Sequence, residues 1–444
     1  MHLTGGEIPT KRNRAAAKPP DAGAGAGGVE EDRLSALPDD TLVLILLRLG
    51  TAGAAGRTSV LSRRWRRVWA LLPELRFPVA PRPHLVASAL SAHEAALREL
   101  IVGTLDATPE SVAAWLPIAA RRLSGDLVYC NVVPAGGAAE EEERGAFELP
   151  CLENATGVGL DLGFVGLAVP PAGVFARLTE LSLSRVRFHG PGELGDAVSS
   201  PRCPSLLKLS VSYAYGLLNL AINSESLLQV ELQHLDRLQK LTIVGSRLQR
   251  LKLLDGLAYS EPVASISAPQ LVMLEWRDWY DPRSIHLGDM EHLQCLTSRF
   301  FIVYGKDDLN MIAHNRACLR LLQRFKVIKF LLIMLAYAWA QPTCPSGCIC
   351  DQPLDWKTEE LLLKHLHEVD IRGLRGYEHE VAFVRRLFHW VPALKKMTVT
   401  FDDSVSGSMA RELHQMLQSF SRTEICMEFY RYQGKTKVLY APED

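Results

Sequence analysis

Three cysteines in the last quarter of the chain form the most metal-like cluster of this sequence. Cys344, Cys348 and Cys350 follow one another as C-x3-C-x-C, and His365 and His367 come downstream. A structural zinc site takes four ligands, which usually arrive as two well-spaced pairs. Three thiols on one loop and a distant histidine match that pattern poorly. We therefore interpret this segment as a loop with partly buried thiols and expect no metal site.

Other patterns that could carry chemistry are incomplete. His93-Glu94 and His379-Glu380 each lack the second histidine of a zinc-protease helix. The sequence has no glycine-rich phosphate loop and no G-x-S-x-G motif. Nothing local would position a base beside a cysteine thiolate. The sequence therefore predicts a protein that is not an enzyme and that uses no cofactor.

The composition is that of an ordinary globular protein. The chain has 444 residues with 48% hydrophobic and 22% charged residues, and its formal net charge is −1. This neutral balance disfavours duplex DNA or an anionic membrane as a partner. The longest apolar run, Phe330 to Ala340, is too short for a membrane helix, which needs about twenty residues. Nine cysteines and the absence of an apolar leader predict reduced thiols in the cytoplasm or nucleus.

The first 30 residues are rich in Gly, Ala, Pro and Lys, with almost no large apolar side chains. Such a segment cannot bury enough surface to offset its ordering entropy, so we expect a disordered tail. The basic run Lys11-Arg12-Asn13-Arg14, with Lys18, is either a nuclear signal or a solvated tail.

Residues 31–77 have the pattern of a small helical unit. Pro38 presets the first turn of a helix, and the apolar residues Leu42, Ile45, Leu46 and Leu49 recur on one face. Gly50 is expected to end this helix, and a short turn of helix is expected at Ala52–Ala55.

A further helix is expected over Ser59–Leu72, where Leu61, Trp65, Val68 and Trp69 share one face and four arginines the other. A unit this small rarely has a self-sufficient core, so part of its apolar face should belong to a partner. Two alternatives are a cap on the following domain and, because of the arginines, a nucleic-acid contact.

A repeat of the form Leu-x-x-Leu-x-Leu is the second strong signal. It starts at Leu178, Leu206, Leu217, Leu227, Leu238, Leu248 and Leu271. Alternate members lie 21 residues apart from Leu206 to Leu248, which predicts a solenoid with two strand-like stretches in each coil. The residues between the inward leucines should face solvent on one sheet, with Ala221 and Thr242 on the other. The outward residues expected on the first sheet are Ser182, Ser210, Glu231, Lys252 and Glu275.

The remaining segments are expected to be mixed. Residues 78–135 should form a helical connector, with helices over Leu90–Thr104 and Pro109–Leu123 and a strand at Leu127–Val133. The acid run Glu140–Glu143 is expected to be a solvated loop. After Trp276 the repeat recurs at Val327-Phe330-Leu332, Leu366-Val369-Ile371 and Leu394-Met397-Val399. Helices over Glu378–Trp390 and Ser408–Phe420 alternate with strands, the last at Glu424–Tyr430, as in an α/β cap.

Three parts of the sequence together resemble a known family. LPDDTLVLILLRL followed by RTSVLSRRWRRVWALLPELRF resembles a plant-type F-box. CPSGCICDQPLDWKTEEL and EHEVAFVRRLFHWVPALKKMTVTF resemble the FBD-type tail of plant F-box proteins with leucine-rich repeats. The resemblance implies an α/β fold: a small all-α F-box helical unit, then a leucine-rich-repeat solenoid with an α/β C-terminal cap. The expected division is 1–30 disordered tail, 31–77 F-box, 78–135 helical connector and first strand, 136–335 solenoid, and 336–444 FBD-like cap.

The resemblance also implies a function. Such F-box proteins bind a Skp-type adaptor and through it a cullin–RING ligase, so the expected role is the substrate-recognition subunit of an SCF-type E3 ubiquitin ligase. The residues expected to bind the adaptor are Leu37, Pro38, Leu42, Ile45, Leu46, Leu61 and Trp65. The outward repeat residues above are the candidates for contact with an unknown protein target. The alternative is a non-catalytic scaffold without ubiquitin-transfer output, because relatives are expected to have further repeats between Leu332 and Cys344. A hydrolase in the C-terminal block is a third, weaker hypothesis.

Overall fold

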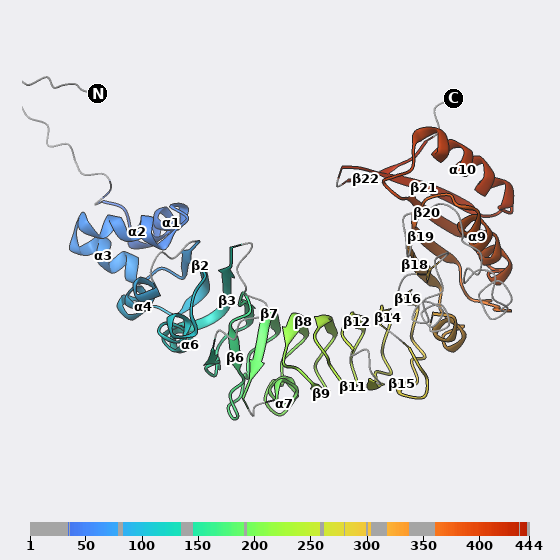
Figure 1. Ribbon diagram of the computed structural model, residues 1–444. Coiled ribbons are helices and arrows are strands. Elements are labelled where there is room, and N and C mark those ends of the chain that lie inside the picture. Colours follow the sequence, from blue (N-terminus) through green and yellow to red (C-terminus); the bar gives the residue numbers. More distant parts are fainter. Residues whose placement is uncertain are drawn as a thin grey trace, which may run out of the picture.

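The computed structural model forms a curved, open crescent with the N-terminal helices at one tip and the last strands at the other (Figure 1). It describes residues 34, 36–78, 83–134, 145–190, 193–257, 262–278, 280–298, 301–302, 318–336, 360–434 and 436–441. The expected disordered tail, the acid run Glu140–Glu143 and the three clustered cysteines lie outside these residues.

The N-terminal tip is built from short helices. These are α1 (Asp39–Arg48), α2 (Ala52–Arg57) and α3 (Arg63–Ala70), with a 3-10 helix at Thr58–Val60. Gly50 follows α1 with φ at +76°, a conformation that glycine adopts without steric cost, so the predicted helix end is confirmed. The hydroxyl of Ser62 accepts the amide hydrogen of Trp65 and caps α3. The predicted helix over Ser59–Leu72 is therefore shorter than expected, since its first turn belongs to the 3-10 helix.

One parallel sheet runs along the inner side of the crescent (Figure 1). Its principal strands pair in the order β1 (Glu74–Phe77), β2 (Leu97–Leu105), β3 (Leu123–Val132), β5 (Gly157–Asp161), β7 (Glu180–His189), β8 (Lys208–Tyr215), β10 (Gln229–Leu235), β12 (Arg250–Leu254), β14 (Met273–Trp276), β16 (Cys295–Ser298) and β18 (Phe330–Ala336). Three short strands, β4 (Ala146–Glu148), β6 (Gly166–Ala168) and β17 (Phe301–Ile302), flank it.

A second sheet lies on the outer side of the same coils. It contains β9 (Asn219–Ser224), β11 (Lys240–Gly245), β13 (Val263–Ser267) and β15 (Ile285–Leu287). Leu209, Val230 and Leu251 pair across β8, β10 and β12, and each lies 21 residues after the last. The predicted coil with two strands is confirmed over this stretch.

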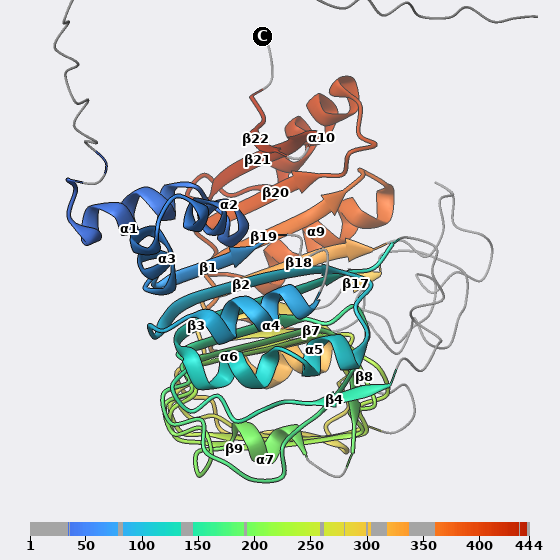
Figure 2. The same cartoon turned by 90° about the vertical axis from the view of Figure 1, so that its left-hand side faces the viewer.

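The region before the repeats corrects one prediction. Leu90–Thr104 is not one helix, because α4 (Pro83–Ala92) ends and β2 begins at Leu97. In LRELIVGTL the buried residues Leu100, Val102 and Thr104 alternate as in a strand, and pairing with β1 and β3 satisfies the backbone. The predicted helix over Pro109–Leu123 is broken into α5 (Pro109–Ala113) and α6 (Leu116–Arg122). Figure 2 shows α4, α5 and α6 side by side against the sheet.

The C-terminal block extends the inner sheet and does not form a separate layer. Its elements are β19 (Glu368–Leu374), α9 (Glu378–Trp390), β20 (Lys396–Phe401), α10 (Gly407–Phe420), β21 (Cys426–Gln433) and β22 (Thr436–Leu439). Strand β19 pairs directly with β18, and only β22 is antiparallel among the pairings of this block. The expected alternation of strands and helices is therefore observed, with α9 at the predicted bounds.

The register predicted for β18 is wrong by one residue. The inward residues are Ile328, Leu331 and Ile333, and Leu331 pairs with Val369. Phe330 lies on the outward face of the strand. A strand that is apolar on both faces gives no alternation, so its sequence cannot specify which face enters the core.

The turn before α9 depends on one buried carboxylate. The side chain of Glu380 is fully buried and accepts hydrogen bonds from the backbone amides of Arg375, Gly376 and Tyr377 at 2.8, 2.6 and 3.3 Å. Replacing Glu380 by Ala leaves these donors without that acceptor, and should cost roughly 1.5–3 kcal/mol or more. Hydrogen exchange at residues 375–377 should accelerate strongly. The matched control is Glu378→Ala, an exposed residue of the same first turn; equal acceleration in both variants would contradict the assignment.

Candidate functional surfaces

The seven residues expected to bind the adaptor divide into three groups by exposure. Leu42, Leu46 and Trp65 are buried at 0%, 1% and 8% exposure in the core of the protein itself. These three side chains position the helices and offer almost no surface to another molecule. Leu37 and Ile45 are half-buried and pack against the same core.

Pro38 and Leu61 are exposed at one end of the helical unit. The guanidinium of Arg64 donates to the Asp39 carboxylate at 2.8 Å and to the carbonyl of Leu37. These contacts fasten the start of α1 to the start of α3, so Pro38 and Leu61 lie at the same end. Leu61 is 64% exposed and its neighbour Val60 is 84% exposed. The sequence pattern singled out Leu61 but missed Val60, which breaks the helical periodicity because it lies in the 3-10 turn.

The five residues expected to contact a target form one straight row across the inner sheet. Ser182, Ser210, Glu231, Lys252 and Glu275 pair in register from β7 to β14, and all five are half-buried. The row is polar, and it lies on the concave side of the crescent (Figure 1). Contact between this row and a protein target stays a prediction.

The charged side chains of this row form hydrogen bonds and ion pairs with other side chains of the same sheet. The Glu231 carboxylate accepts from the amides of Gln229 at 2.6 Å and Gln233 at 3.4 Å. Glu275 pairs with Arg277 at 2.6 Å and lies 3.9 Å from the ammonium of Lys252. Because these contacts hold the side chains in place, the row is an ordered polar surface rather than a set of mobile charges.

A second row, which the sequence reasoning missed, lies at the end of the same strands. Arg185, Tyr213, His234 and Asp255 occupy equivalent positions in four successive coils, each with φ between +44° and +52°. Such backbone is costly for residues other than glycine, roughly 1–3 kcal/mol each, and it tends to persist where a surface has a function. Hydrophobic periodicity does not predict this second row. Each of its residues is an extra residue that forms a bulge, outside the alternation of inward and outward side chains along the strand.

Each side chain of this second row contacts a side chain of an adjacent coil, and we call these residues the ladder. Arg185 makes two hydrogen bonds to the Asp161 carboxylate, at 2.6 and 2.7 Å. The Tyr213 and His234 rings stack with centroids 4.7 Å apart, and His234 Nδ1 lies 3.6 Å from Asp255. Tyrosine and arginine are the residue types most enriched at energetically dominant interface positions, so this ladder joins the first row as a candidate contact surface.

Possible metal ligands and cysteine thiols are the groups among the described residues that bear on catalysis. No group of three or more His, Cys, Asp and Glu side chains among them could hold a metal ion. Burial raises the pKa of the Cys130, Cys151 and Cys295 thiols, and that of Cys203 to about 12, which disfavours the reactive thiolate.

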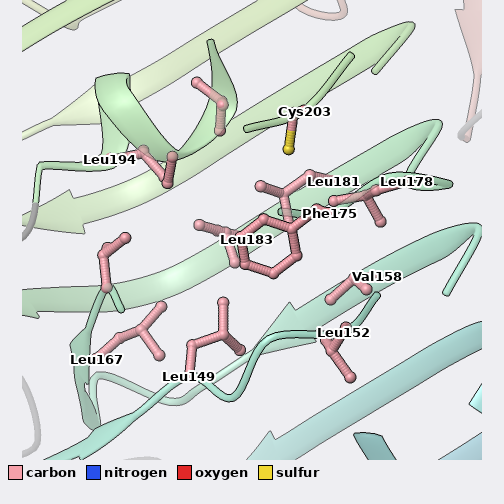
Figure 3. A pocket seen from close by; sticks show the side chains of 13 residues that line it. Leu149, Leu152, Val158, Leu167, Phe175, Leu178, Leu181, Leu183, Leu194 and Cys203 are labelled. Atoms are coloured by element: carbon pink, nitrogen blue, oxygen red, sulfur yellow. The ribbon is translucent and has the colours of Figure 1, made fainter. Parts of the chain in front are cut away.

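The cavity shown in Figure 3 is part of the hydrophobic core. It has a volume of about 20 Å³, lies inside the coils around β7 and α7 (Leu194–Val198), and is lined by apolar side chains such as Leu152, Phe175 and Leu183. A space this small, without polar groups, is a packing defect rather than a ligand site.

The junction between the helical unit and the sheet contains a fully buried histidine. His93 has one ring nitrogen 2.8 Å from the Leu72 carbonyl and the other 3.0 Å from the Ala95 carbonyl. Burial lowers the pKa of His93, and the positive charge of Arg122 lowers it further. The hydrogen bonds to the two carbonyls and the charge of Glu94 raise this pKa, but burial outweighs them.

A lowered pKa in the folded state makes stability depend on pH. The unfolded chain binds a proton at this site more readily, so the free energy of unfolding should fall as the pH drops below about 6.5. We expect His93→Gln to lose less stability than the wild type between pH 7.5 and 5.5 in urea titrations. An equal loss in both proteins would contradict this role of His93.

Comparison with known proteins finds similar proteins from a plant. A family model described as the leucine-rich repeats of the FBD-associated F-box protein At5g56370 matches residues 112–288. The putative F-box/FBD/LRR-repeat protein At4g03220 of Arabidopsis thaliana is 29% identical over 305 residues, which cover 64% of this chain and 58% of that protein. At3g49030, with the same description and organism, is 30% identical over 192 residues, 41% of this chain and 42% of that protein.

A shorter stretch is much more similar. At3g49480, another putative F-box/FBD/LRR-repeat protein of Arabidopsis thaliana, is 57% identical over 47 residues, 11% of this chain and 10% of that protein. The chain thus spans about half the length of the relatives it matches over their longest stretches. No solved structure matches it significantly. Among the described residues no helix is long and apolar enough to cross a membrane.

Proposed function

Because the chain belongs to the plant family of F-box proteins with leucine-rich repeats and an FBD-type C-terminal block, we propose that it is the target-binding subunit of an SCF-type cullin–RING ubiquitin ligase. The N-terminal helices bind a Skp-type adaptor, and the inner sheet of the solenoid binds a protein target. The chain contributes no catalytic residue. It accelerates ubiquitin transfer by holding a target lysine near the charged ubiquitin, which raises the effective concentration of the reacting groups.

The observation that carries this proposal is the exposed apolar end of the helical unit. Val60 and Leu61 leave most of their surface to solvent, whereas Leu42, Leu46 and Trp65 of the same unit are buried. Exposed neighbouring apolar side chains of this kind mark contact sites for other proteins. The unit also packs directly on β1, so whatever binds it is held at a fixed position relative to the concave sheet.

A reconstitution tests the proposal. We expect the full chain to co-elute with a Skp-type adaptor in size-exclusion chromatography, and the assembled ligase to ubiquitylate a target that is captured by the solenoid. Co-elution without transfer to any captured target would favour the scaffold alternative. A folded chain that does not bind the adaptor would overturn the proposal.

A further inference from the structure

A second cavity, much larger than the core defect, lies at the junction of the helical unit and the solenoid. Its volume is about 450 Å³, within the range typical of small-molecule sites. The walls come from α2, α3, β1 and α4, so the cavity lies between the part assigned to the adaptor and the first strand of the sheet. It lies apart from both rows of the inner sheet.

Aromatic and aliphatic side chains form most of its lining. Trp69 and Phe77 are half-buried in it, Val86 is fully buried, and Leu85 is 48% exposed at the rim. The indole N–H of Trp69 donates to the carbonyl of Ala52 at 3.3 Å. This bond fixes the ring, and the rest of the indole is an apolar wall. A flat apolar ligand would contact the rings of Trp69 and Phe77. Its binding would remove little polar surface from water.

Two polar groups border the same space. The Arg76 guanidinium uses one terminal nitrogen for ion pairs to Glu74 at 3.1 Å and Glu99 at 2.7 Å. The two carboxylates more than balance its charge, so an anion gains nothing here, yet guanidinium N–H groups outside these pairs can donate to a neutral oxygen. The Thr51 hydroxyl accepts the amide hydrogen of Ala54 at 3.1 Å, and its own hydrogen can be donated as well.

We propose that this junction cavity binds a small molecule that is neutral and largely apolar, with an oxygen acceptor directed at Arg76 and Thr51. The ligand would contact the helical unit and β1 at once. Its binding would therefore stabilise the folded junction by a free energy that rises with the logarithm of the ratio of ligand concentration to Kd. This inference goes beyond the proposed ligase role and does not depend on it.

Fluorescence titration of the full chain with Prodan, a neutral naphthalene dye with one ketone oxygen, tests the proposal. We expect a saturable blue shift with one site per chain. Ala89→Phe introduces a ring into the lined space and should weaken dye binding at least tenfold. The matched control is Ser88→Phe, the preceding residue of α4, which is exposed and does not line the cavity; it should bind within twofold of the wild type.

Gly53→Phe is a second lining variant, which keeps the proposal testable if Ala89→Phe does not fold. Gly53 lines the cavity on α2, and a Cβ there would meet no heavy atom within 4 Å, so Gly53→Phe adds a ring at this wall without a clash at the Cβ. Loss of dye binding in both lining variants, with circular dichroism unchanged and binding retained in Ser88→Phe, would support the site. Absence of saturable binding by the wild type, or equal binding by Gly53→Phe and the wild type, would overturn it.

Discussion

Replacing Val60 and Leu61 together by aspartate should weaken binding to a Skp-type adaptor at least 100-fold. Both side chains are exposed, 84% and 64%, at the end of the helical unit where α1 and α3 begin. A central apolar anchor of an interface is worth roughly 2 kcal/mol or more, and a 100-fold change corresponds to about 2.7 kcal/mol. The charges themselves should not unfold the unit, because aspartate is favourable just before the N-terminus of a helix. Isothermal titration calorimetry of the full chain against the adaptor measures the change.

The control is a leucine of similar exposure elsewhere. Leu105→Asp changes a side chain that is 61% exposed at the end of β2, outside the N-terminal helical unit, and should bind the adaptor as the wild type does. Wild-type affinity in the Val60/Leu61 double variant would contradict the assigned surface. Trp65→Ala is a poor probe, since that side chain is only 8% exposed and its loss acts on the fold.

Replacing Leu251 by alanine should lower the free energy of unfolding by about 3–5 kcal/mol. Leu251 is 1% exposed and sits between Val230 of β10 and Leu274 of β14 in the inward row of the sheet. Truncating a buried leucine removes its transfer free energy and leaves a cavity that the stacked coils can close only partly. Each coil also contacts mainly its neighbours, so the defect weakens both adjoining interfaces of the solenoid.

Urea unfolding, followed by circular dichroism, measures this effect. Lys252→Ala, the next residue on the strand, points to the opposite face and should change stability by no more than about 0.5 kcal/mol. A Leu251→Ala loss as small as that of Lys252→Ala would contradict the position of Leu251 in the core. Coincident transitions by two probes are needed before either difference is taken as a free energy.

Three strong periodicities made much of the fold predictable from sequence. The 21-residue spacing of Leu209, Val230 and Leu251 fixed the two-stranded coil, because only a regular coil brings residues at that interval into one inward row. The outward row from Ser182 to Glu275 followed from strand alternation alone. Helix α9 was predicted at its observed bounds, since Val381, Val384 and Leu387 recur at helical spacing.

Where periodicity was weak, prediction failed. The sequence predicts a helix over Leu90–Thr104, but residues 97–104 belong to β2, because β1 and β3 pair with them on either side. The register of β18 was lost because both faces of that strand are apolar. The ladder of Arg185, Tyr213, His234 and Asp255 was invisible, since its members are distant in sequence and meet only through stacking of coils.

The sequence by itself determined the organisation of this protein: a helical unit with the residues of an F-box, a leucine-rich solenoid, and an alternating block of strands and helices. These features are local or strictly periodic, so neighbouring residues suffice to specify them. Only the tertiary structure decided which F-box residues are free to touch a partner, burying Leu42, Leu46 and Trp65 while exposing Val60 and Leu61. It alone also formed the cavity between Trp69, Arg76 and Leu85. Exposure and cavities depend on how separate elements pack against one another, and a linear pattern does not contain that information.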